Sequence, residues 1–259
     1  MKNIDRKEDQ VVGLRARLAM LEGQRVREDP LPLKEAGFGA TFDRQALHDL
    51  YAASPADALA VNAFGLGLAV QAANGRPVVW TLHDMTAHEA GHPYAPGLND
   101  MGLDPRDLLL VRASSLPALL AVGEEALRSP AVGAVLLSAW GDAKAMNLTA
   151  SRRLVMAAKS GGATVFLARA SAEPAPSAAE SRWSVRAAAS VPMAANAPGR
   201  PAFSATRLRH RAGRAPRTWT LEWDRERRVF VEPAPLSCGL VSLAAQRSAA
   251  AGKLATRIA

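Results

Sequence analysis

Between residues 46 and 170 the chain alternates short, largely apolar runs with longer segments of helical periodicity, and this alternation restricts the fold more than any other feature. Near-continuous apolar strands are typical of a parallel sheet that helices cover on both faces. The uncharged run 58–75 contains Asn and Gly residues, so it predicts a buried helix rather than a membrane span. The pattern predicts strands over 47–52, 77–82, 107–112, 132–138 and 163–168, with helices over 55–74, 115–128 and 149–160.

The pattern changes after residue 171, where a Pro/Ala/Ser-rich stretch leads into segments of period two. Such segments, at 183–186, 206–211, 218–223 and 228–231, indicate an antiparallel extension. The predicted fold class is therefore α/β, with a mostly parallel central sheet flanked by helices and a C-terminal antiparallel β extension. The predicted divisions are an N-terminal helix and linker (1–40), the α/β core (41–171), the antiparallel extension (172–235) and a C-terminal tail (236–259).

Composition and charge narrow the class of protein. Of the 259 residues 49% are hydrophobic but only 5% are aromatic, which predicts a core of Ala, Leu and Val with helices packed closely on strands. One cysteine excludes an intramolecular disulfide framework, and residues 1–29 lack the apolar stretch of a signal peptide. We therefore expect a cytoplasmic protein that is not in a membrane. The net charge of +8 allows a nucleic acid or an acidic protein as partner.

Two short segments resemble functional motifs: an amphipathic stripe near the N-terminus and a match to a zinc-binding motif. Val11, Leu14, Leu18 and Leu21 recur at three- and four-residue steps, which predicts an amphipathic helix that docks on the body or on a partner. The segment from His88 to His92 matches H-E-x-x-H, the zinc-peptidase motif. Because Gly91 and Pro93 disfavour a helix there, we interpret it as a chance match in a loop and expect no metal.

The loop after the first strand is where a nucleotide-binding α/β protein carries the glycines and lysine that hold phosphates. None of these residues is present here, and the carboxylate of Asp57 would repel a phosphate. The fourth strand ends in Ser138 rather than in a metal-binding acid, and Asp142 follows four residues later. Asp84, just after the second strand, is interpreted as an acid in a loop. We expect no catalytic residue and no cofactor. The degenerate loop consists of Ala53, Ser54, Pro55, Ala56, Asp57 and Ala58.

An arginine series follows in the antiparallel segment. On a strand, Arg207, Arg209 and Arg211 would share one face, since side chains alternate with period two. Such a row suits a phosphate backbone or an acidic partner surface, while the alternative is a solvated edge strand charged against aggregation. The candidate partner- or DNA-binding arginines are Arg207, Arg209, Arg211, Arg214 and Arg217.

The order of strand, nucleotide-loop position, helix and further strands resembles the RecA core, and the details resemble the ImuA family over about residues 44–232. The matching motifs are individually short, but their order and spacing together are fairly specific. They are Leu47-His48-Asp49-Leu50-Tyr51, Gly75-Arg76-Pro77-Val78-Val79-Trp80, Tyr94-Ala95-Pro96-Gly97-Leu98, Gly102-Leu103-Asp104-Pro105, Glu124-Glu125-Ala126-Leu127-Arg128, Ser151-Arg152-Arg153-Leu154 with Ala157-Ala158, Arg182-Trp183-Ser184-Val185, and Arg207-Leu208-Arg209-His210-Arg211 before Trp219.

The resemblance implies a non-catalytic, RecA-like adaptor of the SOS response to DNA damage, which is nucleoid-associated during damage. Members of the ImuA family act in translesion synthesis and mutagenesis with ImuB, a homologue of Y-family polymerases, and with an error-prone C-family polymerase. Binding to RecA is also expected, and direct DNA contact is open. The same superfamily includes SulA, a damage-induced inhibitor of cell division, which is the alternative. The length of the chain and its Arg-rich antiparallel segment favour ImuA.

Overall fold

The computed structural model describes residues 42–142, 144–191, 197 and 199–233, together with residues 13, 14, 17 and 38. The described strands form one nine-stranded sheet in the order β3-β2-β4-β5-β1-β6-β7-β8-β9. The strands are β1 (Leu47–Ala52), β2 (Val78–His83), β3 (Leu108–Ala113), β4 (Ala134–Trp140), β5 (Thr164–Ala170), β6 (Ser181–Ala187), β7 (Ala202–His210), β8 (Arg217–Asp224) and β9 (Val229–Val231).

The sheet has a parallel and an antiparallel part. Strands β1 to β5 pair in parallel, and β6 also lies parallel to β1. The remaining pairs, from β6 to β9, are antiparallel. This arrangement confirms the predicted fold class. The predicted strands are all present, β1 with the predicted bounds and the others with shifted ends. The largest shift is at β7, which begins four residues earlier than its periodicity indicates.

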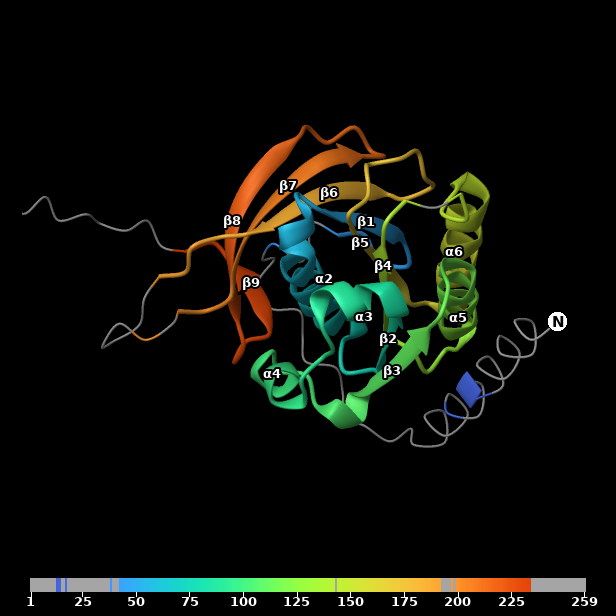
Figure 1. Cartoon of the computed structure of the whole chain (residues 1–259), viewed down its shortest axis with the longest axis horizontal. Helices are drawn as coiled ribbons and strands as arrows, with labels where there is room; N and C mark the ends of the chain where they lie inside the picture. Colours follow the sequence, from blue (N-terminus) through green and yellow to red (C-terminus); the bar gives the residue numbers. More distant parts are fainter. Residues whose placement is uncertain are drawn as a thin grey trace, which may run out of the picture.

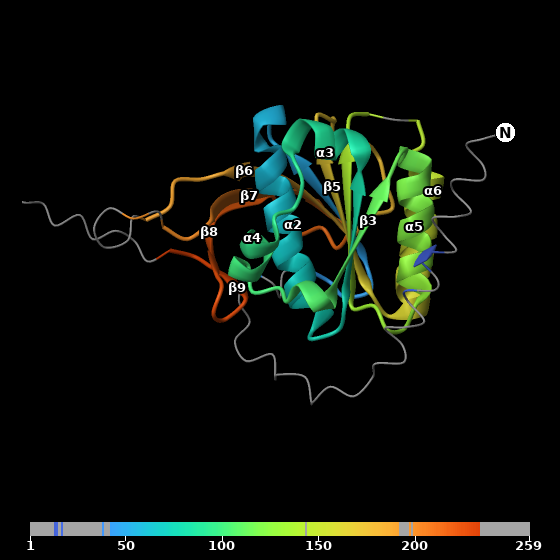
Figure 2. The same ribbon diagram turned by 60° about the horizontal axis from the view of Figure 1, so that its bottom comes forward.

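Helices cover both faces of the parallel part (Figure 2). Helices α5 and α6 pack together on one face, and α2 lies against the other face, with α3 and α4 on its side of the sheet. Capping residues define the ends of α5 and α6: the side chains of Ser115 and Asn147 accept backbone N–H groups, and Gly162 ends α6 in the left-handed region. The helices are α2 (Ala58–Ala73), α3 (Asp84–Ala90), α4 (Ala95–Asp100), α5 (Leu116–Arg128) and α6 (Leu148–Gly161), with 3₁₀ turns η2 (Pro55–Asp57) and η3 (Pro105–Asp107).

The antiparallel strands curve around α2, so this helix is enclosed between two parts of one sheet (Figure 1). Glycines permit the close approach on both sides. A Cβ on Gly65 would lie 2.8 Å from Leu136 of β4, and one on Gly67 would lie 2.7 Å from Phe230 of β9. Among the described residues, 55–73 is the helical segment long and apolar enough to cross a membrane, and more than half of it is buried inside the protein. Its apolar surface is therefore used in the core.

The two faces of the sheet carry two different hydrophobic cores. The aromatic cluster, on the α2 side, contains all six phenylalanines of the chain and four of its five tryptophans, for example Phe64, Trp183 and Phe230. The aliphatic cluster, under α5 and α6, consists of Leu, Val and Ala. The predicted Ala/Leu/Val core therefore describes only the α5/α6 face.

Candidate interaction surface

The N-terminal stripe contributes one described residue. Leu14 is helical, only 2% exposed, and part of the aliphatic cluster, so this residue packs on the body of the protein. Val11, Leu18 and Leu21 lie outside the described residues, as do almost all of the linker and the C-terminal tail.

The degenerate loop lies at the carboxyl end of β1, where the sequence predicts it. Its residues are mostly exposed and form the short turn η2 before α2. Asp57 closes the loop: its carboxylate accepts the hydroxyl of Ser54 at 2.7 Å and the backbone N–H of Ala187 at 3.0 Å. The loop backbone is also tied to β6, because the N–H of Ala53 donates to the carbonyl of Val185. A carboxylate thus lies within the turn where a phosphate loop presents N–H groups.

Asp84, Asp142 and Ser138, which follow or end the second and fourth predicted strands, have structural contacts. Asp84 is the first residue of α3 rather than a loop acid, and it forms an ion pair with Arg112 at 2.8 Å. Asp142 forms an ion pair with the buried Arg169 at 3.0 Å. The hydroxyl of Ser138, near the end of β4, accepts the indole N–H of Trp80 at 2.8 Å.

The H-E-x-x-H match was predicted to lie in a loop, but its first three residues belong to helix α3. Helix α3 includes His88 and Glu89, and it ends at Gly91, whose φ of +83° breaks the helix. His92 therefore lies beyond the helix. Because the second histidine does not continue the helical face of the first, the geometry of a zinc-peptidase site is not formed.

Sequence analysis missed a cluster of His210, Asp43 and Glu180 at the amino end of β6. These residues offer ligand atoms within 4.8 Å of one another. However, Nδ1 of His210 accepts the backbone N–H of Ala212 at 3.1 Å, so in the neutral ring Nε2 carries the proton. That nitrogen lies 3.4 Å from a carboxylate oxygen of Asp43. A metal ion on either nitrogen would displace one of these contacts, so the cluster fits a protonated ring nitrogen facing a carboxylate better than a metal ion.

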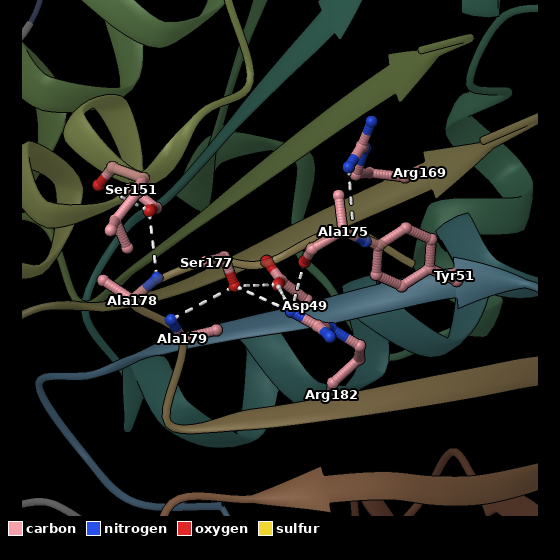
Figure 3. A network of polar contacts seen from close by, with 10 residues as sticks. Asp49, Tyr51, Ser151, Arg169, Ala175, Ser177, Ala178, Ala179 and Arg182 are labelled. Carbon is pink, nitrogen blue, oxygen red and sulfur yellow. Dashed lines mark hydrogen bonds and ion pairs between the residues drawn. The ribbon is translucent and has the colours of Figure 1, made fainter. Parts of the chain in front are cut away.

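A buried polar network joins β1, α6, β6 and the loop between β5 and β6 (Figure 3). Asp49 is 1% exposed, and its carboxylate accepts the hydroxyl of Ser177 and lies 3.7 Å from the guanidinium of Arg182. Arg182 also donates to the carbonyl of Ala175. The hydroxyl of Ser151 accepts the N–H of Ala178 at 2.9 Å. Residues from three widely separated motifs of the ImuA resemblance therefore meet here.

Burial dominates the electrostatics at Asp49. It raises the pKa of the Asp49 carboxyl, because a charged group is poorly solvated there, while the Ser177 hydroxyl and the guanidinium groups of Arg182 and Arg169 act in the opposite direction. A small cavity beside it measures about 10 Å³, the space of a single water. An open groove of about 380 Å³ lies next to it, lined by Arg169, Lys144 and two acids among others. The cavity beside Asp49 is therefore too small for a substrate, and the network itself joins elements of the scaffold.

The arginine series lies on the hairpin of β7 and β8, and the predicted single face is wrong. A β-bulge at residue 208 shifts the register, so that Arg207 pairs with Trp183 but Arg209 pairs with Arg182. Arg207 therefore points toward the α2 side, whereas Arg209 lies on the opposite face of the sheet. Arg211 and Arg214 lie in the turn between the strands. The arginines surround the end of the hairpin instead of forming one row.

Arg207 is the buried member of the series. Its guanidinium lies 5.1 Å from the ring centre of Trp219 and 5.8 Å from that of Trp183, and it donates two hydrogen bonds to the carbonyl of Ala215. Arg217 covers Trp219 at 4.9 Å. Burial, together with the charges of Arg214 and Arg217, lowers the pKa of Arg207. Arg207 therefore holds the turn of the hairpin, while Arg209, Arg211, Arg214 and Arg217 are exposed.

Comparisons with known proteins identify no family. No family model matches the chain, and no curated protein matches its sequence. Solved structures do match. SulA from Pseudomonas aeruginosa is 22% identical, with a TM-score of 0.37, over 48% of this chain and 97% of that one. The RadB recombinase is 12% identical, with a TM-score of 0.47, over 74% of this chain and 93% of that one.

Proposed function

We propose that this chain is a non-catalytic, RecA-like adaptor in DNA-damage-induced translesion synthesis and mutagenesis. Its proposed partners are an ImuB-like homologue of Y-family polymerases and RecA, with an error-prone C-family polymerase joining through the complex. The site of action is proposed to be the cytoplasm, at the nucleoid during DNA damage.

The observation that carries the proposal is the convergence of the motifs that resemble the ImuA family. Asp49, Ser151 and Arg182 come from three of these motifs and contribute to one buried network. A fourth motif supplies the buried Glu124, which forms an ion pair with Arg153 at 2.8 Å. Chance matches scattered along a chain have no reason to pack against one another. The motifs therefore describe one coherent scaffold, as expected if the resemblance reflects a shared fold.

The closed loop supports the non-catalytic part of the proposal. The Asp57 carboxylate holds the turn after β1 together through Ser54 and Ala187. A nucleotide phosphate entering that turn would meet a negative charge and would have to break both hydrogen bonds. We expect no ATP hydrolysis, with or without DNA. Hydrolysis by the purified chain that changes in an Asp57→Asn variant, which keeps the shape of the side chain, would contradict this part.

The test of the partners is direct binding between purified proteins. The full chain is immobilised, and the ImuB-like protein and RecA from the same organism are titrated over it, with an unrelated polymerase as control. Saturable binding of either expected partner supports the adaptor. Absence of binding to both, combined with saturable binding to the division protein FtsZ, would overturn it and favour a SulA-like inhibitor of division.

A further inference from the structure

The outer face of strands β6 to β8 and the end of the β7–β8 hairpin form a surface that no helix covers among the described residues. The outer face is the face turned away from α2 (Figure 1). It carries two rows of side chains that run across three strands. Ser184, Thr206 and Thr218 form one row by their register, and Arg186, Ser204 and Thr220 form the next. Beyond the first row, toward the end of the hairpin, Arg209 is exposed.

The hairpin segment that carries this surface contains positive but no negative side chains. Residues 203–221 contain five arginines and no Asp or Glu. Four of the arginines are exposed at the end of the hairpin, and the acids nearby lie at its margin: Asp43 and Glu180 beside His210, and Glu232 4.0 Å from Arg217. The charged side chains within residues 203–221 are therefore all cationic, and the acids belong to other segments.

The backbone that carries these arginines is tied to the core of the protein. Arg207 binds the carbonyl of Ala215 through two N–H groups, and its guanidinium lies over the rings of Trp183 and Trp219, which ties the turn 211–216 to the aromatic cluster. The hydroxyls of Thr206 and Thr218 hydrogen-bond each other at 2.8 Å. Preorganised donors lose less conformational entropy when they bind a ligand.

We infer that this guanidinium–hydroxyl surface, formed by the hairpin end and the outer face of β6–β8, binds the phosphate backbone of a nucleic acid. Arginine and hydroxyl side chains are among the main donors to phosphate oxygens. The centre of a stable contact with a protein is typically an apolar core in which aromatic side chains are enriched. Among the described residues 203–221, Leu208 is the large apolar side chain that is exposed, at 39%. The inference does not depend on the proposed polymerase partners.

The test measures binding of the full chain to labelled oligonucleotides by fluorescence anisotropy over a range of salt concentrations. The hairpin variant replaces Arg209, Arg211, Arg214 and Arg217 by Gln. The matched control replaces the exposed Arg106, Arg128, Arg152 and Arg225 by Gln and therefore has the same net charge. Arg207 is kept because its burial would confound folding. Thermal unfolding of each variant verifies that the fold is retained.

We expect the hairpin variant to bind about tenfold or more weakly at low salt, and its log–log salt slope to fall by about 0.7 for each phosphate of a single strand that is no longer neutralised. The control should remain within about twofold. Equal weakening of both variants, or no binding by the unchanged chain at about 50 mM salt, would overturn the inference. A polyglutamate competitor that displaces the oligonucleotide at equal or lower concentration would overturn it in favour of an acidic protein.

A second variant tests the outer face separately. Thr206→Val with Thr218→Val removes two hydroxyls with little change of shape or charge. We expect a several-fold loss of affinity with an unchanged salt slope, because no counterion release is involved. Unchanged affinity would overturn the assignment of the outer face. Single-stranded and duplex probes run in parallel show which form of nucleic acid supplies the backbone.

Discussion

The two faces of the central sheet solve the same packing problem with different side chains. On the α5/α6 face, small and branched aliphatic residues let two helices lie close to the parallel strands. On the α2 face, the sheet curves around the helix, and aromatic rings fill the space between strands and helix. Phe38, for example, has its ring centroid within about 6 Å of Phe42, Phe64, Trp183 and Trp219.

The difference shows that a low average aromatic content conceals a strongly uneven distribution. An aromatic side chain typically buries about 150–250 Å², so a few of them can line the concave side of a curved sheet. The same strand β1 separates the two environments. His48 faces the aromatic rings of Phe42 and Phe166, while its neighbour Asp49 faces the aliphatic side.

The largest expected effect is the loss of a central aromatic residue. Trp183→Ala removes a fully buried indole that stacks on Phe42 at 4.8 Å and donates to Ser181 at 2.7 Å. We expect a loss of about 3–5 kcal/mol in the free energy of unfolding, measured by urea denaturation. Leu127→Ala, in the aliphatic cluster, is the comparison and should cost less. An equal or larger loss for Leu127→Ala would contradict the greater importance of the aromatic face.

The next effect is the pH dependence caused by His48. Burial lowers the pKa of His48 from 6.5 to about 4. Between these values the unfolded chain binds the proton and the folded chain does not, so stability should fall by roughly 3 kcal/mol as the pH decreases through this window. Urea denaturation of the unchanged chain and of His48→Gln over this range measures it. The same pH slope in both proteins would contradict this origin.

A smaller effect is expected where α2 touches β8 and β9. Gly67→Ala would place a methyl group 2.7 Å from Phe230 and 2.9 Å from Trp223, which we expect to cost about 1–3 kcal/mol despite the better helix propensity of Ala. The control Gly97→Ala, in α4, has its nearest neighbour at 3.9 Å and should be neutral or stabilising. Thermal unfolding of both variants decides. Equal stability of the two would show that the enclosure of α2 tolerates expansion.

The smallest expected effect has the opposite pH dependence to His48. Because the pKa of Asp49 is raised in the folded protein, the unchanged chain should lose stability relative to Asp49→Asn as the pH rises from 3.8 through the raised value. The Ser177 hydroxyl and the neighbouring guanidinium groups limit the effect. Urea denaturation at about pH 4 and about pH 7 measures the difference. A difference that stays constant or grows in favour of Asp would contradict the dominance of burial.

Much of the fold could be predicted from the sequence, and less of the candidate surface. The alternation of apolar runs located β1 to β5, and period-two segments located β6 to β9, because side-chain periodicity is a local property. The position of the loop at Asp57, directly after β1, and its lack of phosphate-binding residues were also predicted. The prediction that Arg207 and Arg209 share one face was wrong, because the bulge at Leu208 depends on how β7 pairs with β6.

The sequence by itself determined the order of elements, the parallel and antiparallel parts, the buried α2 and the absence of phosphate-loop residues after β1. Only the tertiary structure decided that the aromatic residues gather on one face, that Asp49 meets Ser177 and Arg182, and that Arg207 turns inward while its neighbours remain exposed. The physical reason is sequence distance: Asp49 and Ser177 are 128 residues apart. Hydrophobic periodicity acts within one element, whereas register and burial arise only when distant elements pack together.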